Sequence, residues 1–142
     1  MTLDELKVQV ANDLKVNDER LDTESLKNQE LYAKYLEIKS NFELLMYKAK
    51  GDYKILYRDK WEYYGGKADA KVYAAKPFDI KVLKADVHIY MDSDPELQKA
   101  DQKVAYLDQV IKYLEQVLRG VNNRTFLIKN AIEWKKFTSG AI

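Results

Sequence analysis

The chain has 142 residues, of which 46% are hydrophobic and 33% are charged, and its formal net charge is +1. These values indicate a single folded domain with a modest core rather than a disordered chain. The absence of cysteine excludes disulfides, thiolate catalysis and cysteine-ligated zinc. No hydrophobic run approaches the roughly 20 residues of a membrane span, and Met1 leads into a polar stretch unlike a signal peptide, so we expect an intracellular protein.

Two helices are predicted in the first half of the chain. Thr2 and Glu5 form a capping box before hydrophobic residues at three- and four-residue steps, and Asn17-Asp18 should end this short helix. A second start signal at Thr23 opens a long helical pattern that reaches about residue 64. Gly51 interrupts the pattern, and we expect it to bend or weaken the helix.

Residues 71–91 are predicted to form two or three short strands. They are rich in β-branched and aromatic residues, and Val87, Ile89 and Met91 alternate with other residues as in a strand. The predicted fold class is therefore α+β, mainly α, with long N-terminal helices, a small β element in the middle and a C-terminal helical pair.

The C-terminal pair is predicted from its start and stop signals. Asp94 is a helix cap, Pro95 suits the first helical position, Gly120 should end the helix, and Asn122-Asn123 should begin the last one. Both helices carry hydrophobic residues beyond a single stripe, which favours self-association, although packing against the N-terminal helices within one monomer remains open. We therefore divide the chain into an N-terminal helical and β part, residues 1–93, and a C-terminal helical oligomerisation part, residues 94–142. The predicted oligomerisation residues are Leu114, Leu118, Phe126, Leu127, Ile128, Ala131 and Trp134.

The segment 53–76 is the main functional signal. It interleaves six aromatic residues with six basic ones and contains only three acids. Rings offer stacking surfaces to unpaired bases and cations neutralise phosphates, so single-stranded nucleic acid is the partner that the segment favours. Gly65-Gly66 would let a ligand approach the backbone closely. The alternative is structural, with the tyrosines in the core and the lysines on a solvated surface, and the residues alone leave both readings open.

Other candidate chemistry is weak. His88 does not belong to a catalytic pattern such as a Ser-His-Asp or Cys-His arrangement. The acids of 92–96 lack the spacing of a calcium loop. Asp79-Ile80-Lys81, with Asp69 upstream, has the acid-x-Lys form of some nucleases, but this triplet is common in a chain so rich in charge. The segment 65–67 lacks the spacing of a phosphate-binding loop. We expect no catalytic residue, no metal and no cofactor.

Several short motifs, in order and at similar spacing, make the chain resemble the UvsY recombination mediator proteins of T-even-type bacteriophages. The motifs are Leu31-Tyr32 with Lys34-Tyr35, residues 63–69, residues 82–86, Arg124, Phe126, Ile128-Lys129, Phe137 and Gly140. The DNA-binding motif of that family, Lys-Ala-Arg-Leu, falls on residues 58–61, where Arg58 and Lys60 retain the two cations in exchanged order. Asp59 adds a negative charge there, and Trp61 replaces the leucine.

The resemblance implies a non-enzymatic accessory factor of homologous recombination in the cytoplasm of the infected bacterial host. Such a mediator binds single-stranded DNA covered by single-strand-binding protein and helps a RecA-like recombinase, UvsX, to form its filament. It also implies a ring-like homo-oligomer, hexamer or heptamer, formed by the C-terminal helices. The predicted DNA-binding residues are Arg58, Lys60, Trp61, Tyr63, Tyr64, Lys67 and Lys71. The alternative function is an oligomeric helical scaffold that does not bind DNA.

Overall fold

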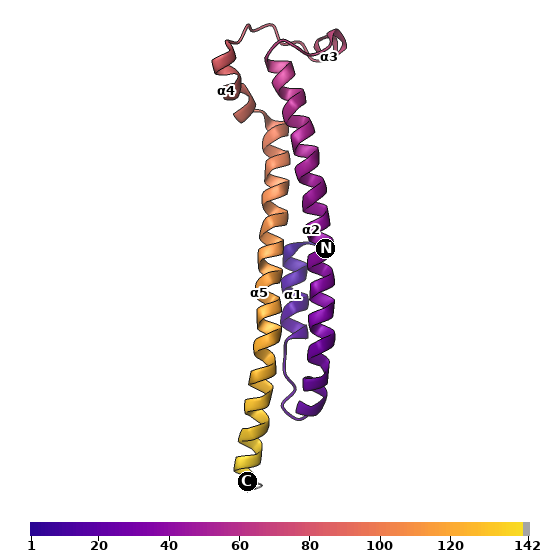
Figure 1. Ribbon diagram of the computed structural model, residues 1–142, viewed down its shortest axis with the longest axis vertical. Coiled ribbons are helices and arrows are strands. Elements are labelled where there is room, and N and C mark those ends of the chain that lie inside the picture. The colour runs from indigo at the N-terminus through magenta and orange to yellow at the C-terminus, as the bar shows by residue number, and fades with distance from the viewer. Residues whose placement is uncertain (141–142) are drawn as a thin grey trace. The chain divides into compact units, whose positions relative to one another are not determined.

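A computed structural model describes residues 1–140, so the last two residues of the predicted oligomerisation part, Ala141 and Ile142, lie outside it. The described chain consists of helices (Figure 1): α1 (Leu3–Asp13), α2 (Leu21–Tyr64), α3 (Ala70–Ala75), the 3-10 helix η1 (Lys84–Asp86), α4 (Val87–Asp92) and α5 (Pro95–Thr138). None of these helices is long and apolar enough to cross a membrane. The chain divides into two compact units, Met1–Glu43 with Gln109–Ile142, and Leu44–Asp108. We call them unit 1 and unit 2.

The predicted β element was wrong, because no strand occurs in residues 1–140 and the described fold is all-α. Where strands were expected, the chain forms α3, a stretch without regular secondary structure, η1 and α4. Val87 and Met91 lie four residues apart on one face of α4 and are 6% and 3% exposed, whereas Ile89 is 55% exposed. The hydrophobic pattern therefore has the period of a helix, in which residues four apart share a face.

The predicted break at Gly120 was also wrong, since α5 is one helix from Pro95 to Thr138. The helix α2 continues through Gly51, where a bend or a weakening rather than a break was predicted. A glycine inside a helix costs only about 1 kcal/mol relative to alanine, which packing along the rest of the helix can offset. The predicted capping box at Thr2 and Glu5 is confirmed.

Unit 1 packs α1 against the first part of α2 and the last part of α5, as Figure 1 shows. Its core residues recur at helical spacing, so each helix contributes one hydrophobic stripe. The fully enclosed side chains include Leu6 from α1, Tyr35 from α2 and Leu114 from α5. The Tyr35 hydroxyl donates to the Asp13 carboxylate at 2.7 Å, which ties the end of α1 to α2.

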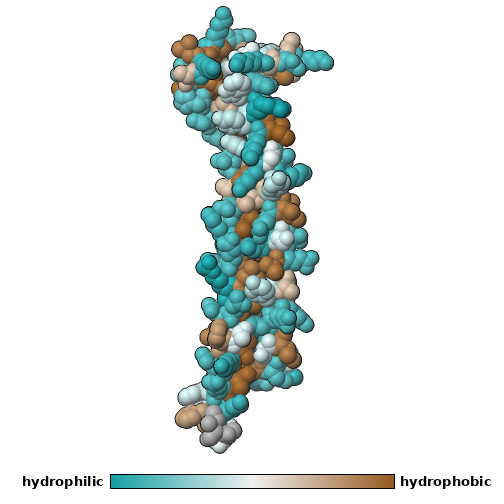
Figure 2. All heavy atoms as spheres, in the orientation of Figure 1, coloured by the Kyte–Doolittle hydropathy of each residue, from teal (hydrophilic) through white to brown (hydrophobic). Residues whose placement is uncertain are grey.

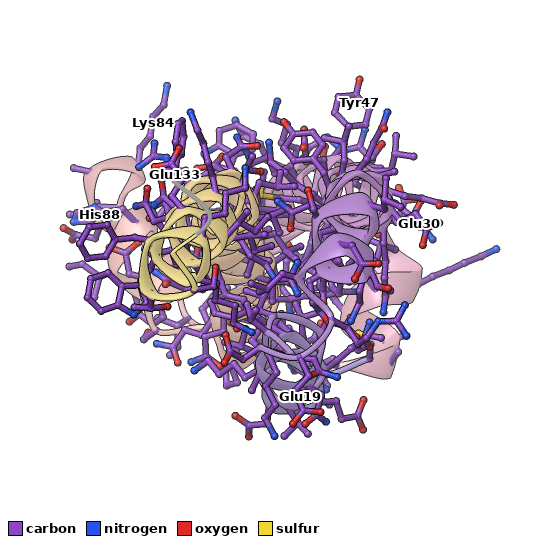
Figure 3. The ribbon with its side chains drawn as sticks, turned by 90° about the horizontal axis from the view of Figure 1, so that it is seen from below. Glu19, Glu30, Tyr47, Lys84, His88 and Glu133 are labelled. Atoms are coloured by element: carbon purple, nitrogen blue, oxygen red, sulfur yellow. The ribbon has the colours of Figure 1, made fainter. Side chains whose placement is uncertain are left out.

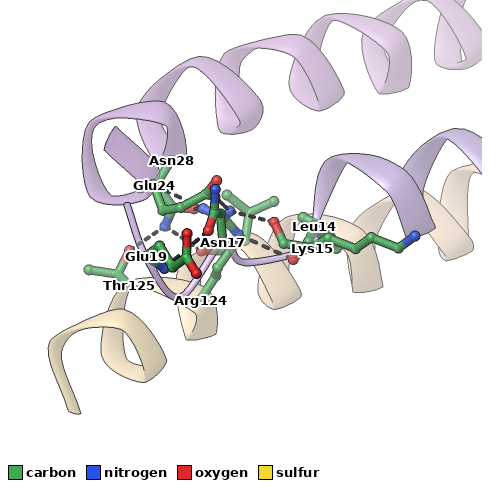
Figure 4. A network of polar contacts seen from close by, with 9 residues as sticks. Leu14, Lys15, Asn17, Glu19, Glu24, Asn28, Arg124 and Thr125 are labelled. Carbon is green, nitrogen blue, oxygen red and sulfur yellow. Dashed lines mark hydrogen bonds and ion pairs between the residues drawn. The ribbon is translucent and has the colours of Figure 1, made fainter. Parts of the chain in front are cut away.

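A buried polar network joins the α1–α2 connection to α5 (Figure 4). The Arg124 guanidinium donates to the carbonyl oxygens of Leu14 and Lys15, at 3.3 and 3.0 Å, where α1 has ended. It also pairs with the Glu24 carboxylate and donates to Asn28 Oδ1 at 3.0 Å. The network supplies partners for backbone carbonyls that the end of a helix leaves free.

Unit 2 contains the end of α2, the short elements α3, η1 and α4, and the start of α5. In the view of Figure 1, α3 and α4 lie on opposite sides of the end of α2. Gly66, at φ +74°, ends α2, with the Lys67 amide donating to the Glu62 carbonyl at 2.8 Å and the Gly66 amide to the Tyr63 carbonyl at 3.4 Å. This is a Schellman motif, which requires the left-handed conformation that glycine adopts without strain.

Candidate nucleic-acid interface

An exposed pairing of a cation with an aromatic ring marks the end of α2. The Lys67 amine lies 4.5 Å from the centroid of the Trp61 ring, and Trp61 is 38% exposed. The Schellman turn reverses the chain between them and brings the lysine back over the ring. A partly exposed ring beside an exposed cation has the two features that an unpaired nucleotide needs, a stacking face and a charge for its phosphate.

Arg58 and Lys71 are further exposed cations of unit 2. Within residues 1–140, Arg58 pairs with its neighbour Asp59 at 3.3 Å, and the side chains of this pair are 66% and 54% exposed. An exposed ion pair of this kind contributes little to stability and exchanges readily for another anion. Lys71 lies on α3, seven residues after the end of α2 at Tyr64.

Lys60 lies in a different environment from Arg58, because its side chain is only 10% exposed. Its amine is 3.1 Å from Asp94 Oδ2 and 3.5 Å from Glu96 Oε2. The structure therefore separates the two cations of the 58–61 motif, one facing solvent and the other enclosed.

Asp94 combines three interactions at the start of α5. As predicted, it caps the helix, and its Oδ1 accepts from the backbone amides of Glu96 and Leu97, both at 2.9 Å. Its Oδ2 accepts from the Tyr64 hydroxyl at 2.5 Å and pairs with Lys60. Burial alone would raise the pKa of Asp94, but the hydrogen bonds from Tyr64 and Leu97 and the Lys60 ammonium together lower it below its ordinary value.

Tyr63 and Tyr64 belong to an aromatic cluster inside unit 2, with Tyr73, Phe78 and Tyr90. The Tyr63 and Tyr73 rings stack at 5.5 Å, and the Tyr63 hydroxyl donates to the Lys76 carbonyl at 3.1 Å. Burial and the hydrogen bond to Asp94 raise the pKa of Tyr64. Both rings thus pack against neighbouring residues, as the structural reading of the segment expected for its tyrosines.

A hollow of about 490 Å³ adjoins this surface. Tyr63 and Val72 give it apolar walls, and Lys60, Lys67 and Lys76 contribute cations. Asp59, Glu62, Asp69 and Glu96 also line it, so its charge is mixed rather than purely positive. Phosphates are therefore better accommodated at the exposed cations outside the hollow than within it.

The comparisons with known proteins identify the family. A family model described as "Recombination, repair and ssDNA binding protein UvsY" matches residues 9–141, which is most of the chain. The chain belongs to the UvsY family. The predicted resemblance is therefore confirmed, and the protein is a member of a family of recombination mediators.

This UvsY-family chain is similar to a protein of phage T4 in both sequence and structure. It is 21% identical to the recombination protein uvsY of Enterobacteria phage T4 over 140 residues, with 99% of each chain covered. Two crystal forms of the T4 recombination mediator protein UvsY, lattice types II and IV, match with TM-scores of 0.85 and 0.86 at 21% identity. The matches cover 98% and 96% of this chain and 98% and 99% of those chains. At this identity the structures establish a shared fold.

The predicted oligomerisation residues of the UvsY-family chain fall into two groups. Leu114, Leu118 and Ile128 are buried within unit 1, and Ala131 is partly buried. The exposed group consists of Phe126, Leu127 and Trp134, each 64–66% exposed, and the Trp134 ring stacks on exposed Phe137 at 5.8 Å. On the face shown in Figure 2, hydrophobic side chains reach the surface in separate patches among hydrophilic ones.

The acidic residues considered for metal binding do not converge. Within residues 1–140, no group of three or more histidine, aspartate or glutamate side chains is arranged to hold a metal ion. His88 lies on α4 rather than on the expected strand and points outward in Figure 3, with one ring nitrogen 2.9 Å from the Ala85 carbonyl.

Sequence reasoning missed the carboxylate partners of Lys60. Asp94 was recognised only as a helix cap, and it lies 34 positions from Lys60 along the chain. Local patterns carry no signal for such a pair. By contrast, the stacking of Lys67 on Trp61 lies within the segment that the aromatic-basic pattern had singled out.

Proposed function

We propose that this protein binds single-stranded DNA through unit 2 and, as a homo-oligomer, helps a RecA-like recombinase to replace single-strand-binding protein on that DNA. It would act as a non-enzymatic mediator inside the infected bacterial host. Membership of the UvsY family supports this role, and the exposed Lys67–Trp61 pair beside Arg58 is the observation of the structure that carries it.

The proposed contact residues are Arg58, Trp61, Lys67 and Lys71. All four are exposed, and they offer either a positive charge for phosphate or, in Trp61, a ring on which a base can stack. Tyr63 and Tyr64 instead belong to the aromatic cluster that supports this surface. Three cations form a weak site alone. Repeated on the subunits of a ring, hexameric or heptameric, they would act at high effective concentration along one flexible strand.

The test is titration of a fluorescent single-stranded oligonucleotide at several salt concentrations, with duplex DNA as the comparison. We expect tighter binding to the single strand and a steep loss of affinity with salt. Arg58→Ala and Lys67→Ala should each weaken binding and reduce the salt slope, by about 0.7 for each phosphate contact removed in a single-strand complex. Lys15→Ala, which removes an exposed lysine of unit 1, is the matched control and should change neither.

The alternative is an oligomeric scaffold without affinity for DNA, and the packing of Tyr63 and Tyr64 in the aromatic cluster favours it over a surface on which every ring stacks on bases. It predicts no binding at physiological salt, with stability lost on truncation of either tyrosine. If the unmodified protein does not bind the oligonucleotide even at low salt, the scaffold function is supported and DNA binding is refuted.

A further inference from the structure

We propose that Lys60 is a positioning residue, which fastens the end of α2 to the start of α5 so that the neighbouring Arg58 and Trp61 are presented to DNA, rather than a residue that contacts phosphate. The inference deepens the proposed function and rests on it. It assigns different roles to two cations that stand two positions apart in one motif.

Helix geometry separates the two cations. At about 100° per residue, side chains two positions apart point in nearly opposite directions from the axis. The structure shows this separation, since the Arg58 side chain is 66% exposed and that of Lys60 is 10% exposed. One strand of DNA on the exposed face of α2 would meet Arg58 and Trp61 while Lys60 points into unit 2.

Lys60 is also already neutralised. Its ammonium contacts Asp94 at 3.1 Å and Glu96 at 3.5 Å, so two carboxylates surround one cation. The local field at Lys60 is therefore not attractive to a phosphate. The Lys60 ammonium also lies 5.8 Å from the centroid of the Tyr63 ring, on the side of the aromatic cluster.

Moving Lys60 out to DNA would disturb the start of α5. The Asp94 side chain is 1% exposed, and it would remain enclosed without its cation. Removing one partner of an enclosed ion pair is strongly destabilising because it leaves an uncompensated charge. The same carboxylate caps α5 and holds the Tyr64 hydroxyl, so Lys60, Tyr64 and the first turn of α5 form one connected unit.

Asp94→Asn gives opposite results for the two roles of Lys60. Asparagine keeps an oxygen that can cap the helix but removes the charge that holds the lysine. If Lys60 positions the surface, single-strand affinity should fall several-fold. If Lys60 contacts phosphate, removal of a competing anion should free it, and affinity should rise. Glu96→Gln is the matched control, because it removes one negative charge 3.5 Å from the lysine without touching the cap, and it should not lower affinity.

A second pair of variants, Lys60→Met and Arg58→Met, separates loss of a contact from loss of positioning. Lys60→Met should lower the affinity and the unfolding midpoint while leaving the salt slope unchanged, whereas Arg58→Met should lower the slope by about 0.7 and leave the midpoint unchanged. Lys60→Arg, which can still reach Asp94, should restore most of the affinity. If Lys60→Met fails to fold, Asp94→Asn and Lys60→Arg still test the role.

The outcomes distinguish the inference from the function on which it rests. Tighter binding by Asp94→Asn, or a reduced salt slope in folded Lys60→Met, would overturn the positioning role and leave DNA binding intact. An unmodified protein that does not bind the single strand would overturn both.

Discussion

Arg124 is the residue on which the polar interior of unit 1 depends. Its guanidinium pairs with the Glu24 carboxylate and donates hydrogen bonds to the Glu24 carbonyl at 3.0 Å and to the Asn28 side chain. It also donates to the carbonyls of Leu14 and Lys15, just after α1. Asn28 in turn donates to the Val121 carbonyl at 2.8 Å and to Thr125 at 2.6 Å. Among the described residues, no buried side-chain nitrogen or oxygen lacks a hydrogen-bond partner. A network satisfied in this way is costly to break at any member.

Arg124→Met should destabilise unit 1 strongly, because it leaves the buried Glu24 without its cation and removes the donors to the Leu14 and Lys15 carbonyls just after α1. We expect a loss of roughly 3–5 kcal/mol in the free energy of unfolding, measured by urea denaturation. Arg119→Met, at an exposed position of the same helix, is the control and should change it little. Equal losses in the two variants would contradict the role assigned to the network.

Asp94 makes the stability of unit 2 depend on pH. Its pKa is lowered in the folded state from the ordinary value of 3.8, so the folded protein binds the proton less readily than the unfolded chain. The contribution is therefore fully present above pH 3.8 and is lost as the pH falls through the lowered value. Unfolding midpoints measured from neutral to acid pH should fall less steeply in Asp94→Asn than in the unmodified protein. Parallel curves would show that Asp94 is not a source of this dependence.

At the scale of elements, the turn that ends α2 sets where Lys67 lies. Gly66 supplies the left-handed residue of the Schellman motif, and the next residue is the lysine that covers Trp61. Gly51, by contrast, lies inside the same helix, and a Cβ there would meet nothing within 4 Å. The glycine of the turn after α2 therefore has a conformational role that alanine cannot take over, whereas the glycine inside the helix has none.

Gly66→Ala should destabilise the protein by about 1–2 kcal/mol, because an L-residue is strained in the left-handed region. Gly51→Ala should instead stabilise it by about 0.5–1 kcal/mol through helix propensity. Denaturant unfolding of the two variants beside the unmodified protein measures both signs. Gly66→Ala should also weaken single-strand binding. If the variant is destabilised but binds single-stranded DNA with full affinity, the turn does not position the DNA-binding residues.

The sequence predicted features that depend on neighbouring residues and did not predict those that depend on contacts between distant residues. Thr2 with Glu5, and Asp94 with Pro95, were identified correctly because a cap and its helix are adjacent in the chain. The short helix α4 was misread because six residues span fewer than two turns, so its helical period resembles alternation. The enclosure of Lys60 was not predictable, since it depends on how distant segments pack.

At the scale of the whole molecule, the exposed apolar residues near the end of α5 require an explanation. Phe126, Leu127 and Trp134 remain exposed in a single chain although several neighbours on the same helix are buried. Exposed aromatic and aliphatic side chains gathered on one element are typical of an interface between proteins. We propose that they meet other copies of this chain.

Leu127→Glu should release monomers, because a charge at a subunit interface loses water without gaining a partner. Light scattering at micromolar concentration measures the change in mass, and oligonucleotide titration should show weaker binding through lost multivalency. Leu44→Glu, at an exposed leucine of unit 2, is the matched control. An unmodified protein that scatters as a monomer would refute the proposed assembly.

The connection between Arg124 and the end of α1 also governs the order in which the chain can fold. The residues joined there are 110 and 109 positions apart, whereas unit 2 is one continuous segment, Leu44–Asp108. During synthesis the ribosome releases α1 long before it releases Arg124, so the carbonyls of Leu14 and Lys15 must remain hydrated until the last helix emerges. Unit 2 can assemble in the interval. The first helix to be made is thus among the last to reach its final packing, and a nascent chain stalled before Arg124 should expose α1 to proteases.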